Sequence, residues 1–181
     1  TINLMNGFPQ LENAAGNYSF YDKRFSVSLT NGYVGDQAKR LDLSGSNLVV
    51  NNTDIKPYPA QLNLNSVGPL SALISLSNLE KNNGFEVPKS IQGDAKLKGI
   101  LNLPLKREIK PQEITYKLFG TIEDIKIIEK TFPYDLEAAR LSLEINEGRL
   151  QLNGPIIVGD IPVDLKYISG FGKEGLNIAP S

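Results

Sequence analysis

The fold is decided by the stretch Leu141-Ser142-Leu143-Glu144-Ile145, the turn Glu147-Gly148 and the stretch Leu150-Gln151-Leu152 that follows it. Apolar and polar side chains alternate in both stretches. A period of two places the apolar side chains on one face of a β-strand and the polar ones on the other. Glycine between such stretches tolerates the positive φ that hairpins require. These residues therefore predict two antiparallel strands that share one apolar face.

The same alternation recurs along most of the chain. It is found at residues 25–29, 41–44, 61–65, 95–98, 116–118 and 163–167. Turn-forming pairs separate these stretches, among them Asn31-Gly32, Gly45-Ser46 and Gly159-Asp160. The pattern predicts a mostly β protein built as an antiparallel meander.

One segment departs from this period. Leu70, Leu73 and Ile74 are spaced as on one face of a helix. Pro69 suits a first helical turn, and Asn82-Asn83-Gly84 suits a stop. We therefore predict one short helix that lies against the sheet.

Two parts of the chain resemble each other. Residues 38–43 and 138–143 both follow the pattern Ala-x-Arg-Leu-x-Leu, and each is followed by a turn and a second strand. This internal similarity favours a strand over a helix for residues 135–140. It predicts a first β-repeat at residues 1–68, a short helix and connector at 69–84 and a second β-repeat at 85–181, in one continuous structural domain.

The composition excludes several kinds of site. The chain has 181 residues, with 19 Lys and Arg against 20 Asp and Glu, and it contains neither His nor Cys. Ser-His-Asp and Cys-His catalysis and thiolate or imidazole zinc sites are therefore excluded. A net charge of -1 argues against nucleic-acid binding, whose affinity comes largely from neutralised phosphates. We expect no enzymatic activity, no catalytic residue, no metal site, no cofactor and no nucleic-acid partner.

Two features resemble parts of a binding or catalytic site, but each has a simpler interpretation. Gly170-Phe171-Gly172-Lys173-Glu174-Gly175 matches a dinucleotide-binding pattern, which requires a following helix to receive the pyrophosphate. Residues 176–181 do not offer that helix, so we interpret the motif as a glycine-rich loop. Glu123 and Asp124 are adjacent on a predicted strand, so they point to opposite faces unless a bulge intervenes. We interpret both as solvated residues.

The apolar stripe itself has two interpretations. The first is the core of an ordinary sandwich or barrel. The second is a sheet curled over an open groove whose apolar floor holds acyl chains. Leu and Ile dominate the stripe, which suits a hydrocarbon chain because hydrophobic attraction is non-directional and scales with the area buried. Composition leaves both interpretations open.

Short motifs follow one another from Pro9 to Leu105. They are Pro9-x-x-x-Asn13-x-x-Gly16; Asp22-x-x-Phe25-Ser26-Val27-Ser28-Leu29-x-x-Gly32; Leu41-x-Leu43-x-Gly45; Leu48, Asp54, Pro59 and Leu62; Val67-Gly68-Pro69-Leu70-x-Ala72-Leu73; Ile91-Gln92-Gly93-Asp94-Ala95; and Leu103-Pro104-Leu105. Their order resembles the central region of AsmA-like bacterial envelope proteins, the YhdP and TamB group. The resemblance implies a curled, groove-like sheet, the shape called a β-taco.

The resemblance also implies a non-enzymatic segment that carries phospholipid between the inner and outer membranes. Because the chain begins at Thr1, we interpret it as a piece of a longer protein. The resemblance implies that this longer protein lies in the bacterial periplasm and is anchored to the inner membrane by parts outside this chain. We expect phospholipid or another amphiphile as its partner, with acyl chains on the apolar face. The predicted lipid-binding residues are Val27, Leu29, Leu41, Leu43, Leu62, Leu64, Leu97, Leu118, Leu141, Leu143, Leu152 and Leu165.

The alternative function is a structural or adhesive β-module that binds protein partners through an edge strand. An open trough would favour lipid transport, whereas two tightly packed layers would remove its physical basis.

Overall fold

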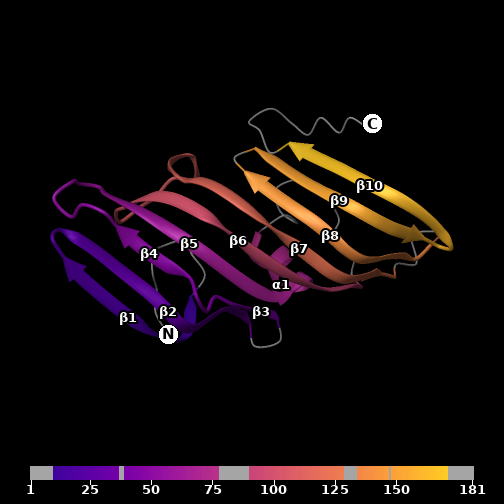
Figure 1. The fold of residues 1–181 in the computed structure, drawn as a ribbon, viewed down its shortest axis with the longest axis horizontal. Coiled ribbons are helices and arrows are strands. Elements are labelled where there is room, and N and C mark those ends of the chain that lie inside the picture. The colour runs from indigo at the N-terminus through magenta and orange to yellow at the C-terminus, as the bar shows by residue number, and fades with distance from the viewer. Residues whose placement is uncertain (1–9, 37–38, 78–89, 129–133, 147, 171–181) are drawn as a thin grey trace.

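The computed structural model describes residues 10–36, 39–77, 90–128, 134–146 and 148–170. Within these ranges the chain forms a ten-stranded sheet with an α-helix and a 3-10 helix (Figure 1). The strands are β1 (Leu11–Tyr21), β2 (Arg24–Asp36), β3 (Lys39–Asp42), β4 (Asn47–Val50), β5 (Tyr58–Pro69), β6 (Ile91–Leu105), β7 (Thr115–Ile127), β8 (Leu136–Asn146), β9 (Arg149–Val158) and β10 (Ile161–Gly170). The helices are α1 (Leu70–Ser77) and η1 (Pro111–Glu113). The predicted mostly β fold with one short helix is confirmed.

Neighbouring strands of the described sheet are antiparallel, and their order follows the chain. The order is β1-β2-β3-β5-β6-β7-β8-β9-β10, and β4 pairs with both β2 and β5. Antiparallel strands that are adjacent in sequence and in space form a meander. The predicted meander is therefore confirmed, and β8 confirms the choice of a strand from residue 136 onward.

β3 and β4 are two halves of one strand that runs along β2. Asp42 pairs with Tyr33, and Asn47 pairs with Ser28, in one continuing antiparallel register. The Gly45 N–H donates to the Leu29 carbonyl in the turn between the two halves. This turn interrupts the strand without reversing the chain.

The corresponding turn in the second similar stretch does reverse the chain. Asn146 pairs with Arg149, so β8 and β9 form a hairpin. The two similar stretches therefore differ in topology at this point. The sheet is continuous across the predicted boundary because β5 pairs with β6 from Tyr58 to Pro69. The division into two repeats stays a prediction.

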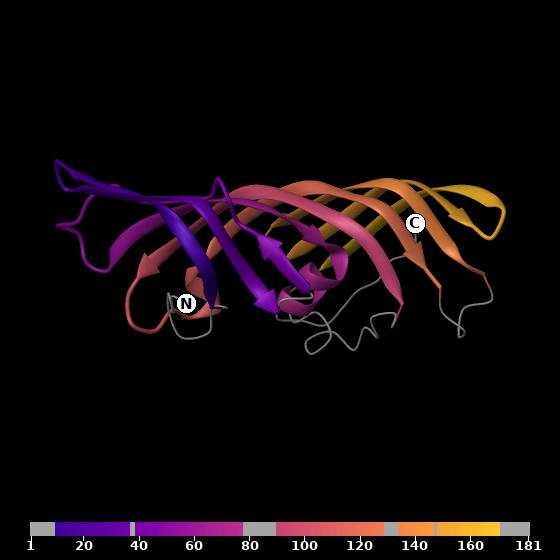
Figure 2. The same cartoon turned by 90° about the horizontal axis from the view of Figure 1, so that it is seen from below.

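The sheet is arched, and α1 lies on its concave side (Figure 2). We call the side that carries α1 the inner face and the opposite side the outer face. Directly opposed residues of neighbouring strands point to the same face. One inner-face row across β5–β10 consists of Ser66, Leu97, Gly120, Leu143, Leu152 and Tyr167.

Leucine side chains cover glycines of the neighbouring strand on the inner face. The pairs are Gly68 with Leu41, Gly99 with Leu118, Gly120 with Leu97 and Gly154 with Leu141. At each glycine, an added Cβ would lie between 2.7 and 3.0 Å from a leucine Cδ2 atom. Curvature crowds side chains on a concave face, and glycine in a strand allows such close approach. These pairs let the sheet curl while its apolar face stays packed.

The turn expected at Asn31-Gly32 is wrong, because β2 passes through both residues. A Cβ at Gly32 would lie 3.1 Å from Cδ1 of Leu11 and 3.6 Å from Cδ1 of Leu29. Gly32 therefore provides space for packing on the inner face instead of a reversal of the chain.

The helix α1 packs on the middle of the inner face. Leu70 and Ala72 are buried, and Leu73 packs against apolar residues on both sides of the helix. The predicted helix is confirmed, but Pro69 is the last residue of β5 and lies outside the helix. The predicted stop at residues 82–84 lies outside the described residues. The short helix thus divides the inner face into two ends.

Gly120→Ala is expected to lower the free energy of unfolding by about 1–3 kcal/mol. Its Cβ would lie 1.9 Å from the carbonyl oxygen of Lys96. Urea unfolding followed by circular dichroism measures the loss. Gly170→Ala is the matched control, since its Cβ would lie 3.6 Å from the carbonyl oxygen of Gly148. The control should change the free energy by less than about 0.5 kcal/mol, and equal losses in the two variants would contradict the steric argument.

Candidate functional site

All twelve predicted lipid-binding residues lie on the inner face, by strand register and packing, and each is buried or half-buried. Leu41, Leu97, Leu141 and Leu143 are buried. The others are half-buried. Alternation therefore predicted residues that share one face, but a shared face does not make every residue accessible to a ligand.

Most of the twelve belong to apolar clusters of the described chain. Leu97, Leu141 and Leu143 are buried with α1 in a cluster against which Leu152 and Leu165 pack. In a second cluster, Leu41 is buried with Ala72 of α1, and Leu29 and Leu43 pack against it. Leu62 packs in a third cluster around Val50, Ala60 and Leu103. Most of the predicted residues thus contact the protein's own core.

The remaining three residues lie outside these clusters. They are Val27, Leu64 and Leu118, all half-buried. Leu118 covers Gly99 of the neighbouring strand, and Leu64 is directly opposite that glycine. Val27 lies at the β1–β2 end of the inner face.

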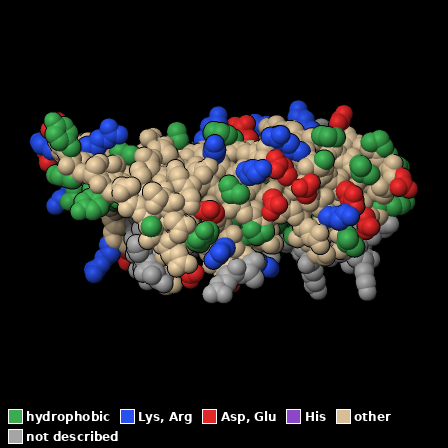
Figure 3. Space-filling model, turned by 60° about the horizontal axis from the view of Figure 1, so that its bottom comes forward, with side chains coloured by type: hydrophobic (Ala, Val, Ile, Leu, Met, Phe, Trp, Pro, Cys, Tyr) green, Lys and Arg blue, Asp and Glu red, His purple; other side chains and the backbone are tan. Residues whose placement is uncertain are grey.

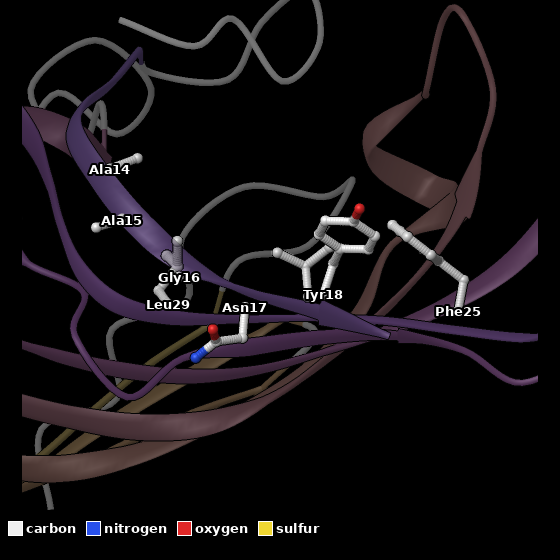
Figure 4. Close-up of a pocket in the computed structure, with 8 residues that line it drawn as sticks. Ala14, Ala15, Gly16, Asn17, Tyr18, Phe25 and Leu29 are labelled. Atoms are coloured by element: carbon white, nitrogen blue, oxygen red, sulfur yellow. The ribbon is translucent and has the colours of Figure 1, made fainter. Parts of the chain in front are cut away.

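An apolar hollow of about 380 Å³ lies at the β1–β2 end of the sheet (Figure 4). It is lined by Ala14, Ala15, Gly16, Asn17, Tyr18, Phe25, Val27 and Leu29. Tyr18 and Phe25 rise on the same side of the β1–β2 ribbon, whereas Asn17 points to the opposite side. The hollow is therefore an inner-face feature with aromatic and aliphatic walls.

Small residues and an irregular register open this hollow. The pairing of β1 with β2 shifts on both sides of Ala15, and Asn13 has a φ of 48°. A Cβ at Gly16 would lie 2.2 Å from the carbonyl oxygen of Ser28, so this position accepts only glycine. The missing side chains leave space between the larger walls.

The sequence prediction found Val27 and Leu29 but missed Tyr18 and Phe25. Phe25 begins the alternating stretch that supplied Val27 and Leu29. The run Ala14-Ala15-Gly16 was a usable signal, because small side chains on an apolar face leave space. Only the register across β1 and β2 places Gly16 opposite Leu29 and Tyr18 opposite Val27, and so brings the small residues into the same hollow as the aromatic ones.

The outer face carries ion pairs between neighbouring strands, beside exposed apolar residues such as Ile100 and Phe119. Lys96 Nζ lies 2.6 Å from Glu123 Oε2, and Lys126 Nζ lies 2.9 Å from Glu137 Oε1. Positive and negative side chains are interspersed along the molecule (Figure 3). Exposed pairs of this kind contribute little stability individually.

The neighbouring acids Glu123 and Asp124 do not form an acid pair. A bulge does occur here, because Asp124 has a φ of 52° and the register shifts opposite it, between Gln92 and Asp94. Glu123 is nevertheless engaged by Lys96, while Asp124 is exposed. The hydrogen bond from Lys96 lowers the pKa of Glu123 from its ordinary value of 4.5. Glu123 is therefore a half-buried, ion-paired residue of the outer face, whereas Asp124 is exposed to solvent as expected.

Other chemical sites are small or incomplete in the described ranges. A polar hollow of about 60 Å³ lies among Glu144, Asn146, Arg149 and Gln151. Across the same residues, no group of three His, Cys, Asp or Glu side chains could hold a metal ion. The described helices include none with the length and apolar character needed to cross a membrane. Of the glycine-rich motif at residues 170–175, only Gly170 is described.

The chain matches no protein-family model, no curated protein and no solved structure.

Leu143→Ala is expected to lower the free energy of unfolding by about 2–5 kcal/mol, because it leaves a cavity in a packed cluster. Leu143 is only 4% exposed. Leu64→Ala should cost clearly less, since Leu64 is half-buried and lies outside the clusters. Urea unfolding measures the free energy of unfolding of both variants. A larger loss for Leu64→Ala would reverse the assignment of core and surface.

Glu123→Gln is expected to reduce the sensitivity of stability to acid. The folded-state pKa of Glu123 is lowered, so its contribution is present above pH 4.5 and is lost as the pH falls through the folded-state pKa below that value. Urea midpoints measured at neutral and acidic pH test this. Glu144→Gln is the control, because Glu144 lies 3.6 Å from Lys117 in a looser, exposed pair. An unchanged acid dependence in Glu123→Gln would contradict the prediction.

Proposed function

We propose that the inner face binds the acyl chains of phospholipids or related amphiphiles and that the protein transfers lipid without enzymatic chemistry. The observation that carries this proposal is the apolar hollow beside β1 and β2. Its walls are aromatic and aliphatic, and the described residues include no second sheet that covers it. An aliphatic chain suits such a surface because its attraction depends on area and not on direction.

The free energy that an acyl chain gains by binding in the hollow is modest. This suits a transfer protein, because such a protein must also release its lipid. Each methylene group removed from water contributes about 0.8 kcal/mol, so about five of them would contribute roughly 4 kcal/mol. A polar head group would stay in water. Binding of this strength allows a lipid both to enter and to leave.

The inner face offers accessible apolar surface at both ends. Tyr18 is exposed beside the hollow, and Ile161 and Val163 are exposed on β10 at the opposite end. Ile161 and Val163 pair with Val158 and Ile156, which belong to the inner-face cluster, so they share that face. The helix α1 fills the middle. This arrangement supports binding at the two ends of the face.

The cellular setting of the proposal rests on the resemblance to AsmA-like envelope proteins. In that setting the chain is one segment of a periplasmic bridge for phospholipid, anchored to the inner membrane elsewhere. The absence of His and Cys from the sequence suits a non-enzymatic role.

Val27→Asp is expected to lower the phospholipid that co-purifies with the protein by about tenfold or more, because a carboxylate in the apolar hollow is strongly unfavourable. The β signal in circular dichroism should stay, since Val27 lies outside the buried clusters. Ile100→Asp is the matched control: Ile100 is exposed and is directly opposite Lys117. Quantitative mass spectrometry of organic extracts measures the lipid.

The control should retain the wild-type amount of lipid. Equal lipid in wild type and Val27→Asp, or a wild-type protein without any bound amphiphile, would refute binding in the hollow.

A second candidate function is the binding of a protein through an edge strand. In the described sheet β10 pairs only with β9, and it carries the exposed Ile161 and Val163. An unpaired strand edge with apolar side chains can accept another strand. Native mass spectrometry separates the two functions, because only the first predicts a bound amphiphile.

A further inference from the structure

Three strongly exposed aromatic side chains of the described chain gather at one end of the molecule, whereas Tyr134, also 64% exposed, lies elsewhere, just before β8. Tyr18, Phe20 and Tyr21 are 79%, 64% and 83% exposed, and Ile55 is 53% exposed. The first three belong to the β1–β2 hairpin, and Ile55 belongs to the neighbouring β4–β5 connection. Both turns lie at the left end of the long axis in Figures 1 and 2. We call these four residues the aromatic tip.

The aromatic tip presents apolar groups on both faces of the hairpin. Tyr18 and Phe20 lie on the inner face, opposite Val27 and Phe25. Tyr21 is the next residue after Phe20, so it points to the other face. A flat partner surface would cover one of these faces and leave the other in water. A lipid interface surrounds an inserted hairpin and covers both.

The backbone of the aromatic tip is held in place. Asp22 and Lys23 both have positive φ, 44° and 64°, as in the tight two-residue turn of a hairpin. The N–H of Thr53 donates to the carbonyl of Lys23 at 2.8 Å, and Lys23 Nζ lies 2.6 Å from Asp54 Oδ2. The two turns therefore support each other, which reduces the entropy lost on docking.

Cationic side chains accompany the aromatic ones. Lys23 and Lys56 lie in the two turns with Asp22 and Asp54, and Arg24 is the first residue of β2. Together these five side chains leave one net positive charge. Figure 3 shows hydrophobic and Lys or Arg side chains together at this end of the molecule. Aromatic rings combined with Lys and Arg are typical of segments at the level of lipid head groups. The charge complements an anionic surface.

We propose that the aromatic tip docks into the head-group interface of an anionic phospholipid bilayer. Tyr18 belongs both to the tip and to the wall of the hollow, so docking brings the hollow to the bilayer surface. This last step rests on the proposed function, whereas docking itself does not. The described segment would then contact a membrane directly, in addition to any anchor elsewhere.

A single introduced tryptophan tests docking, because the chain contains none. Phe20→Trp should show a blue shift of its emission with vesicles that contain phosphatidylglycerol, and brominated lipids should quench it. Phe119→Trp is the control, since Phe119 is also exposed but lies on β7 far along the sheet order from β1. Its emission should not change. An unchanged emission of Phe20→Trp, or equal shifts at both positions, would overturn the proposal.

Flotation with the same vesicles measures the affinity. The double variant Phe20→Ser with Tyr21→Ser should bind about tenfold or more weakly than wild type. Arg24→Gln with Lys56→Gln should reduce binding to phosphatidylglycerol vesicles toward that seen with pure phosphatidylcholine. If circular dichroism shows that a double variant does not fold, the emission of Phe20→Trp decides whether the aromatic tip docks into the bilayer.

The outcomes separate docking from lipid binding in the hollow. Val27→Asp should lose co-purified lipid and still float with vesicles, because Val27 is not part of the aromatic tip. Loss of lipid without loss of docking identifies two distinct sites. A blue shift of Phe20→Trp that appears without vesicles and grows with protein concentration would assign the aromatic tip to contact between protein molecules and would refute the bilayer.

Discussion

The structure depends on the need to shield one apolar face of a single sheet from water. In the described chain no second sheet covers that face. The sheet instead curls, leucines such as Leu97 close over glycines such as Gly120, and α1 packs on the middle. Burial of apolar area is the main favourable term in folding, so these contacts determine the shape of the whole molecule. The outer face can then carry ion pairs and amides without a core of its own.

This way of covering the face leaves its two ends open. The helix is short, and the buried residues Leu97, Leu141 and Leu143 belong to the cluster that contains its Leu70. Toward β1 the small residues around Gly16 leave a hollow between aromatic walls, and beyond it the hairpin ends in exposed rings. The hollow and the aromatic tip are contiguous through Tyr18. An apolar hollow beside a tip with aromatic and cationic side chains is the arrangement that the proposed lipid transfer requires.

Sequence patterns predicted elements better than they predicted sites. The alternation in residues 141–152 and the spacing of Leu70, Leu73 and Ile74 identified strands and a helix because both are local properties of the backbone. The same reasoning misread Asn31-Gly32, since glycine serves turns and close packing alike. It also treated Leu143 and Val27 as equivalent, although one is core and the other lines the hollow. Tyr18 and Phe20 were missed because a hairpin tip is recognised only when the strand register is known.

The sequence by itself determined most of the strands, the helix and which side chains of a regular strand share the apolar face, because alternate residues of an extended chain point to alternate faces. It also excluded histidine and cysteine chemistry by composition. Only the tertiary structure decided which leucines are buried and which apolar surface stays accessible to solvent. That decision depends on contacts between residues far apart in sequence, such as Ala72 with Leu41 and Gly16 with Leu29, and alternation carries no information about them.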